Sequence, residues 1–69
     1  GDHCHIAAQA CLGSRVVLEK GVHIGLNATV KESLKIGRYA ALGMGSVLTK
    51  DIEENEIWVG NPAKLLRKL

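Results

Sequence analysis

The chain has 69 residues, so we expect one small domain, and such a domain buries only about 60% of the surface of its unfolded chain. A formal net charge of +2, without clustering of basic and aromatic residues, argues against nucleic-acid binding. Apolar residues make up 46% of the chain, but it has no apolar run of about 18 residues and no signal-peptide pattern, so we expect neither a membrane span nor a secretory leader. Tyr39 and Trp58 are its large aromatic residues, which favours a narrow aliphatic core.

The N-terminal segment contains both cysteines, Cys4 and Cys11. Two cysteines are too few for a disulfide framework, and buried or free thiols of this kind are typical of a reducing compartment. We therefore expect a cytoplasmic protein. The chain opens with Gly-Asp-His-Cys and no initiator Met, so we expect it to have been processed or cut from a longer protein, although a naturally short solenoid remains an alternative.

A strict period of six residues runs along the chain. Its anchors are aliphatic and occur without insertion or deletion at Ile6, Leu12, Leu18, Ile24, Val30, Ile36, Leu42 and Leu48. Four places after the anchors stand Ala10, Val16, Val22, Ala28, Leu34, Ala40, Ser46 and Ile52. Neither an amphipathic helix nor a two-sided strand has this period, so it predicts a solenoid with two inward positions in each unit.

The repeat also predicts corners. Glycine follows the anchor at Gly13, Gly25, Gly37 and Gly43, and Gly1 holds the same slot before the first full unit. Three places after the anchor come residues that tolerate a positive φ, namely Gly21, Asn27 and Gly45, and also Asp51, but Gln9, Arg15, Ser33 and Tyr39 show that this preference is partial. A corner every six residues predicts short flat strands.

The last sixteen residues depart from the repeat. Residues 1–53 are predicted to form the solenoid, and residues 54–61 a connecting segment. Asn61 is a suitable N-cap and Pro62 a suitable first helical residue, so residues 62–69 are predicted to form a short capping helix with Leu65, Leu66 and Leu69 on one face. A solenoid needs such a cap to prevent edge-to-edge pairing.

The repeat over residues 1 to about 53 resembles that of the left-handed β-helix, or hexapeptide-repeat, acyltransferases. The ending Val59-Gly60-Asn61-Pro62-Ala63-Lys64 resembles the segment that closes the helix in that family. Together with the segments 1–6, 18–27 and 41–45, it is most similar to the branch of sugar N- and O-acetyltransferases, including those acting on nucleotide-linked amino sugars and sialic acid. The resemblance implies an all-β solenoid, a left-handed parallel β-helix, with an acyl-transfer function. In that family three units complete one coil, so residues 1–53 are expected to form nearly three coils, in which residues three units apart stack about 4.8 Å from one another.

The resemblance also implies a donor site for acetyl-CoA. It places His5 at the thioester, Leu26, Gly43 and Met44 along the pantetheine arm, and Lys64 or Arg67 near the phosphates. The relatives carry Gly where this chain has Met44. Their catalytic base is a different His, paired with a carboxylate, and it corresponds to a position before residue 1. An N-terminal domain that binds the nucleotide sugar is implied as well, so we expect this chain to be the C-terminal part of an enzyme.

The histidines leave alternatives open. His5 and His23 are three repeat units apart, so they are predicted to stack at one outward position of successive coils. Two exposed polar residues without a role are one interpretation, and a pair that binds a thioester carbonyl or orients an acceptor is the other. With His3 they also permit a zinc site resembling that of β-helical carbonic anhydrases. The spacing does not match that class, and we expect no metal.

Two functional classes follow. The first is an acetyltransferase that moves an acetyl group from acetyl-CoA to an amine or hydroxyl of a sugar or nucleotide sugar. The second is a non-catalytic solenoid that serves as a trimerisation module. The Gly-Asn-Pro-Ala-Lys ending favours the transferase, because a passive spacer needs only some cap. In either case a small triangular prism gains buried surface by assembling into a homotrimer.

Overall fold

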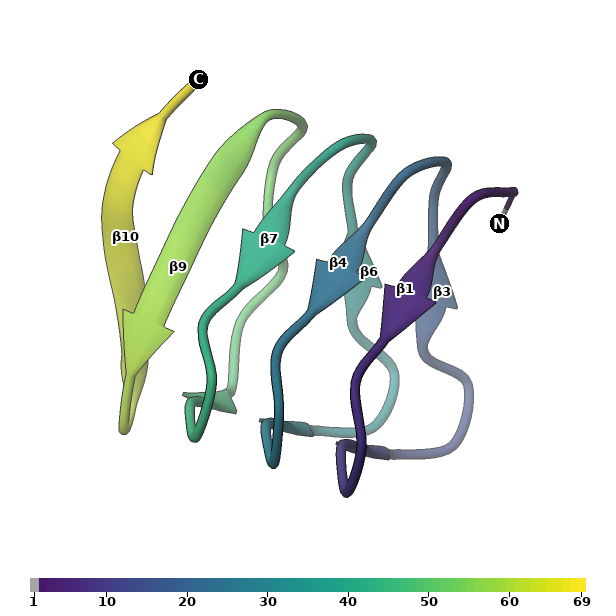
Figure 1. The fold of residues 1–69 in the computed structure, drawn as a ribbon, viewed down its shortest axis with the longest axis vertical. Coiled ribbons are helices and arrows are strands. Elements are labelled where there is room, and N and C mark those ends of the chain that lie inside the picture. Colours follow the sequence, from purple (N-terminus) through teal and green to yellow (C-terminus); the bar gives the residue numbers. More distant parts are fainter. Residues whose placement is uncertain (1) are drawn as a thin grey trace.

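The computed structural model describes residues 2–69, and Gly1, which the repeat places in a glycine slot, lies outside them. Successive short strands wind into stacked coils with one strand on each of three faces (Figure 1). The strands are β1 (His5–Ile6), β2 (Cys11–Leu12), β3 (Val17–Leu18), β4 (His23–Ile24), β5 (Thr29–Val30), β6 (Lys35–Ile36), β7 (Ala41–Leu42), β8 (Val47–Leu48), β9 (Glu56–Gly60) and β10 (Ala63–Lys68). The all-β solenoid that the repeat predicts is confirmed.

Parallel pairing between coils sets the register. One sheet has the order β1-β4-β7-β9-β10, a second β2-β5-β8 and a third β3-β6. Ile6 pairs with Ile24, and Ile24 with Leu42, which confirms the predicted inward ladder and its spacing of three repeat units. The ladder of Leu12, Val30 and Leu48 is confirmed in the same way.

The two inward positions of each unit build the core. Its buried aliphatic members are Val22, Ile24, Ala28, Val30, Ile36, Ala40, Leu42, Leu48, Ile52 and Ala63. Ser46 occupies an inward slot and is also buried, and its hydroxyl accepts a hydrogen bond of 2.9 Å from the backbone N–H of Gly60. The first coil has a neighbouring coil on one side only, so its anchor Ile6 is 47% exposed.

The corners three places after the anchors adopt the left-handed conformation whatever residue they carry, except at Asp51, where the expected positive φ is absent because the third coil is shortened there. Positive φ angles occur three places after the anchors at Gln9, Arg15, Gly21, Asn27, Ser33, Tyr39 and Gly45. The backbone N–H of each corner residue of the later coils donates to a carbonyl one coil earlier, as from Asn27 to Ala8 at 3.0 Å and from Tyr39 to Lys20 at 2.9 Å. These hydrogen bonds offset the local cost of a positive φ, which explains why the preference for residue type is only partial.

The third coil is shorter than the others. Leu42 pairs with Trp58 instead of a residue three full units later, and Ile36 forms an isolated bridge with Ile52. In the preceding coil, the N–H of Val17 donates to the carbonyl of Leu34 at 2.9 Å. At the equivalent point of the next coil, the N–H of Lys35 donates to Oδ1 of Asp51 at 2.8 Å. The Asp51 carboxylate thus replaces a backbone acceptor.

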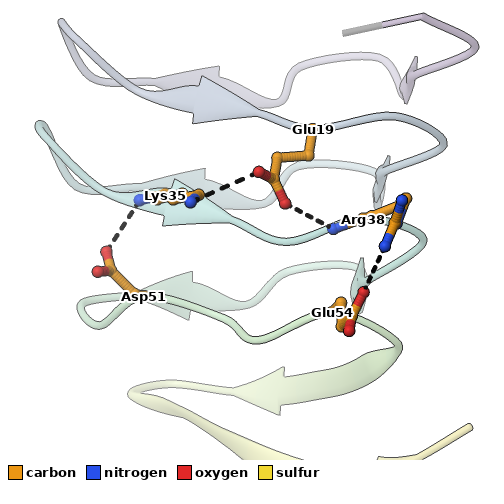
Figure 2. A network of polar contacts seen from close by, with 5 residues as sticks. All are labelled: Glu19, Lys35, Arg38, Asp51 and Glu54. Atoms are coloured by element: carbon orange, nitrogen blue, oxygen red, sulfur yellow. Dashed lines mark hydrogen bonds and ion pairs between the residues drawn. The ribbon is translucent and has the colours of Figure 1, made fainter.

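Hydrogen bonds and ion pairs of charged side chains connect the coils on this shortened face (Figure 2). Glu19 accepts a hydrogen bond of 3.1 Å from the N–H of Arg38 and lies 3.5 Å from the ammonium of Lys35. The guanidinium of Arg38 donates to Glu54 at 3.0 Å, and this hydrogen bond, together with the Glu54 charge, raises the pKa of Arg38. These side chains are largely exposed, so the ion pairs contribute little to the free energy of unfolding.

The capping helix predicted for residues 62–69 is wrong. These residues contain β10, which pairs antiparallel with β9, and β9 lies within the segment predicted to be a mere connection. β9 pairs with β7 and becomes the edge strand of the sheet. The hydrogen-bonding groups on its free edge are satisfied by pairing with β10, whereas a helix would leave them unpaired. Gly60 and Ala63 are paired across the hairpin, and the two residues of the turn between them, Asn61 and Pro62, are joined by a cis peptide bond.

The three leucines that were expected to share one face of the helix do not pack against the solenoid. Their exposed fractions are 50% for Leu65, 60% for Leu66 and 69% for Leu69. The hairpin still covers the end of the solenoid, with Ala63 buried and Trp58 packed against the core. Capping is therefore achieved with strands.

Within residues 2–69, the structure has no helix long and apolar enough to cross a membrane.

Candidate functional site

The outward side of the first sheet carries a stacked pair of imidazoles. His5 on β1 and His23 on β4 are register partners. Their ring centroids lie 4.8 Å apart and their planes differ by 12°. Both side chains are exposed, while the neighbouring anchor Ile24 points inward and is buried. The predicted stacking of His5 and His23 is confirmed, and it leaves the polar edges of both rings open to a ligand.

The corner that follows this sheet presents two apolar side chains. Leu26 is 48% exposed and Met44 is 75% exposed. They occupy equivalent positions of successive coils, and the corners that carry them are joined by a hydrogen bond of 2.8 Å from the N–H of Gly45 to the carbonyl of Leu26. Leu26 lies three residues after His23 in the same coil. Exposed apolar groups thus follow the imidazole pair at the next corner of the coils, a combination suited to an acyl chain or a thioether arm.

The end of the hairpin approaches the same corner. A Cβ atom on Gly43 would lie 2.6 Å from Cγ1 of Val59, and Val59 pairs with Lys64 across the hairpin. In Figure 1 the turn between β9 and β10 lies at the lower side of the view, as do the corners that follow β1, β4 and β7. The structure therefore brings Lys64 to the end of the sheet that carries Gly43 and Met44.

A pocket of about 220 Å³ opens beside Lys64. It is lined by Thr49, Lys50, Trp58, Pro62, Ala63, Lys64 and Leu65. Two ammonium groups beside an indole and a proline ring suit an anionic group attached to a flat ring. Sequence reasoning missed Lys50, which lies just beyond the last anchor. Arg67 pairs with Ile57, farther along β10 from the turn, and is not among the residues that line this pocket.

The remaining candidates do not form a metal centre. Among residues 2–69, no group of three or more His, Cys, Asp or Glu side chains is placed to hold a metal ion. His3 lies at a corner with a φ of 62°, away from the paired strand positions of His5 and His23. The thiol of Cys4 donates to the carbonyl of Glu19 at 3.1 Å, and Cys11 is exposed on another sheet. The geometry gives the zinc alternative no support.

Comparison with known proteins gives consistent likenesses, although no family model matches the chain. A 2,3,4,5-tetrahydropyridine-2,6-dicarboxylate N-acetyltransferase of Staphylococcus aureus is 30% identical over 99% of this chain. The chain spans 32% of that relative's length, about a third.

Solved structures share the fold. A hexapeptide-repeat acetyltransferase from Vibrio cholerae matches 100% of this chain and 49% of its own, with a TM-score of 0.96 and 25% identity. A galactoside acetyltransferase in complex with coenzyme A matches 99% of this chain and 43% of its own, with a TM-score of 0.94 and 26% identity. The six-residue repeat, the stacked coils and these likenesses show that the chain forms the left-handed β-helix of the hexapeptide-repeat acetyltransferases, to which it is similar.

Proposed function

We propose that the protein is an acetyl-CoA-dependent acetyltransferase and that this chain binds the donor. The observation that carries the proposal is the stacked pair of exposed imidazoles beside the apolar corner of Leu26 and Met44. A structural relative, the galactoside acetyltransferase, has been solved with coenzyme A bound. A non-catalytic trimerisation module needs neither the imidazole pair nor the two lysines of the terminal pocket.

The donor would extend along the corner in three parts. The pantetheine arm would lie by Leu26, Gly43 and Met44, and its thioester would reach His5, which is on the adjoining sheet. The phosphates would lie near Lys64, and Lys50 on the other side of the pocket would add a second positive charge. The Met44 side chain, which is flexible and 75% exposed, would pack against the arm.

The chemistry of acetyl transfer needs only a donor, an acceptor and a base. An acceptor nitrogen or oxygen attacks the carbonyl carbon of the thioester, the carbon–sulfur bond breaks, and the acceptor proton passes to a general base as coenzyme A leaves as the thiolate. A donor N–H from His5 would stabilise negative charge that develops on the acyl oxygen. The base is proposed to be a histidine before residue 1.

The acceptor is proposed to be an amine or hydroxyl of a sugar, and in particular of a nucleotide-linked sugar, in a cytoplasmic enzyme. The relatives named above act on a dicarboxylate and on a galactoside, so the fold itself does not choose the acceptor. Release of free coenzyme A thiol by an enzyme that includes the residues before residue 1, in the presence of amino sugars, neutral sugars and serine, tests this choice. Turnover with serine alone would contradict the sugar acceptor.

We expect the chain to form a homotrimer, because a solenoid of 69 residues gains buried surface when three prisms pack around a threefold axis. Light scattering coupled to size-exclusion chromatography, at micromolar concentration, measures the mass directly. A single species with three times the mass of the chain is the expected result. A monodisperse monomer would overturn the trimer.

Acetyl-CoA is expected to bind this chain, with His5 contributing through its contact with the acyl group. Replacing His5 by Ala should weaken binding by about 0.5–1.5 kcal/mol, the usual net contribution of one hydrogen bond. Isothermal titration calorimetry measures the affinity, and His3→Ala serves as a control in the same N-terminal segment. If the wild-type chain binds no acetyl-CoA, the donor site is wrong and the trimerisation module becomes the better interpretation.

A further inference from the structure

The backbones of the stacked histidines are held by the same hydrogen bonds between coils as the other outward positions. The N–H of His5 donates to the carbonyl of Val22 at 2.9 Å, and the N–H of Ala7 donates to that of Ile24 at 2.9 Å. One coil later, the N–H of His23 donates to the carbonyl of Ala40 at 3.0 Å. Both Cα positions are therefore fixed. The freedom left to each imidazole is rotation about its own side-chain torsions.

Stacking limits that freedom. His5 is exposed, and one face of its ring is turned toward the second coil. That face is covered by His23, with a centroid distance of 4.8 Å and nearly parallel planes. Beyond His23 the column continues with Ala41, whose methyl group cannot stack. His5 and His23 are thus the stacked ring pair of this column.

We propose that His23 is a positioning residue that holds the His5 imidazole in the orientation in which its ring nitrogen faces the acyl oxygen of the donor. This inference rests on the proposed binding of acetyl-CoA at His5. His23 itself lies one coil farther along the sheet and acts through the stacked ring. What His23 contributes is the face of an aromatic ring, so another aromatic residue at this position should hold His5 in the same way.

The expected size of the effect follows from the side-chain torsions. A histidine without a stacking partner samples up to three staggered χ1 wells and two broad χ2 orientations, so about one in three to one in six conformers remains productive. Apparent affinity falls by the fraction of competent conformers. We therefore expect His23→Ala to weaken acetyl-CoA binding by about three- to sixfold.

The experiment compares acetyl-CoA with free coenzyme A by calorimetry on the 69-residue chain. Free coenzyme A has no acyl oxygen, so His23→Ala should leave its affinity unchanged. His23→Phe keeps a flat ring and should restore acetyl-CoA affinity, whereas His3→Ala should alter neither affinity. In the His5→Ala background, His23→Ala should have no further effect, because the two residues act as one unit.

A second measurement reports on the stack without any ligand. In NMR spectra the ring protons of His5 should shift on His23→Ala, which removes the neighbouring ring current, and retain a stacked environment in His23→Phe. If these shifts occur but acetyl-CoA affinity is unchanged in His23→Ala, the positioning role is overturned while donor binding stands. Equal losses for acetyl-CoA and free coenzyme A would also overturn it, because they indicate general damage to the site. If the wild-type chain binds neither compound, the proposed function fails and this inference fails with it.

Discussion

Replacing Ile24 by Asp is expected to abolish cooperative folding of the chain. Ile24 is completely buried and lies between Ile6 and Leu42 in the central ladder of the core. Truncating such a residue costs about 2–5 kcal/mol, and an unpaired buried carboxylate adds several more. A domain of this size has a free energy of unfolding of about 3–10 kcal/mol, so the loss is comparable to the whole of it.

The matched control is Thr29→Asp, which places the same side chain on an outward position of β5, the next strand along the chain. Thr29 is exposed, so its replacement should change the free energy of unfolding by about 1 kcal/mol or less. Circular dichroism with thermal and urea denaturation measures both variants. Equal midpoints for Ile24→Asp and Thr29→Asp would show that the inward ladder is wrongly assigned.

The second large effect is expected for Gly25→Ala. A Cβ atom at this position would lie 2.6 Å from the backbone nitrogen of Met44 and 2.9 Å from the carbonyl oxygen of Leu42. Both obstacles are backbone atoms of the next coil, held by the hydrogen bond of 2.8 Å that the Gly25 N–H donates to Leu42. The coils must move apart to accept one methyl group, and we expect a loss of about 1–3 kcal/mol.

Gly45→Ala separates this steric effect from the conformational preference of glycine. Gly45 has a φ of 68°, but a Cβ atom there would have no other atom within 4 Å. Its replacement should cost only about 1–2 kcal/mol, the penalty of the left-handed conformation. Chemical denaturation ranks the two variants, and acetyl-CoA affinity should fall more in Gly25→Ala, which displaces the corner of Leu26 and Met44. A larger loss of stability for Gly45→Ala would contradict the close approach of the coils at Gly25.

The candidate site was predictable to the extent that it depends on the spacing of residues along the coils. The spacing of three repeat units was sufficient to predict the stacking of His5 on His23, because each residue of a regular coil has its register partner one coil later. The contribution of Lys50 was not predictable, because the pocket that it lines exists only where β10 folds back beside the third coil. The roles of Leu26, Gly43, Met44 and Lys64 in donor binding stay predictions.

The sequence by itself determined the solenoid, since every six-residue unit repeats the same inward and corner positions and each coil contacts only its neighbours. Tertiary structure alone decided how the solenoid ends. Asn61-Pro62 is compatible with a helix start and with a hairpin turn, and the short segment after it has too little helix stability of its own to select the first. Because the third coil is two residues shorter than the others, β9 pairs with β7 and its other edge is free. Pairing with this edge stabilises residues 63–68 as a strand instead of a helix. The Asp51 carboxylate likewise completes the ladder at Lys35 only because that coil is short.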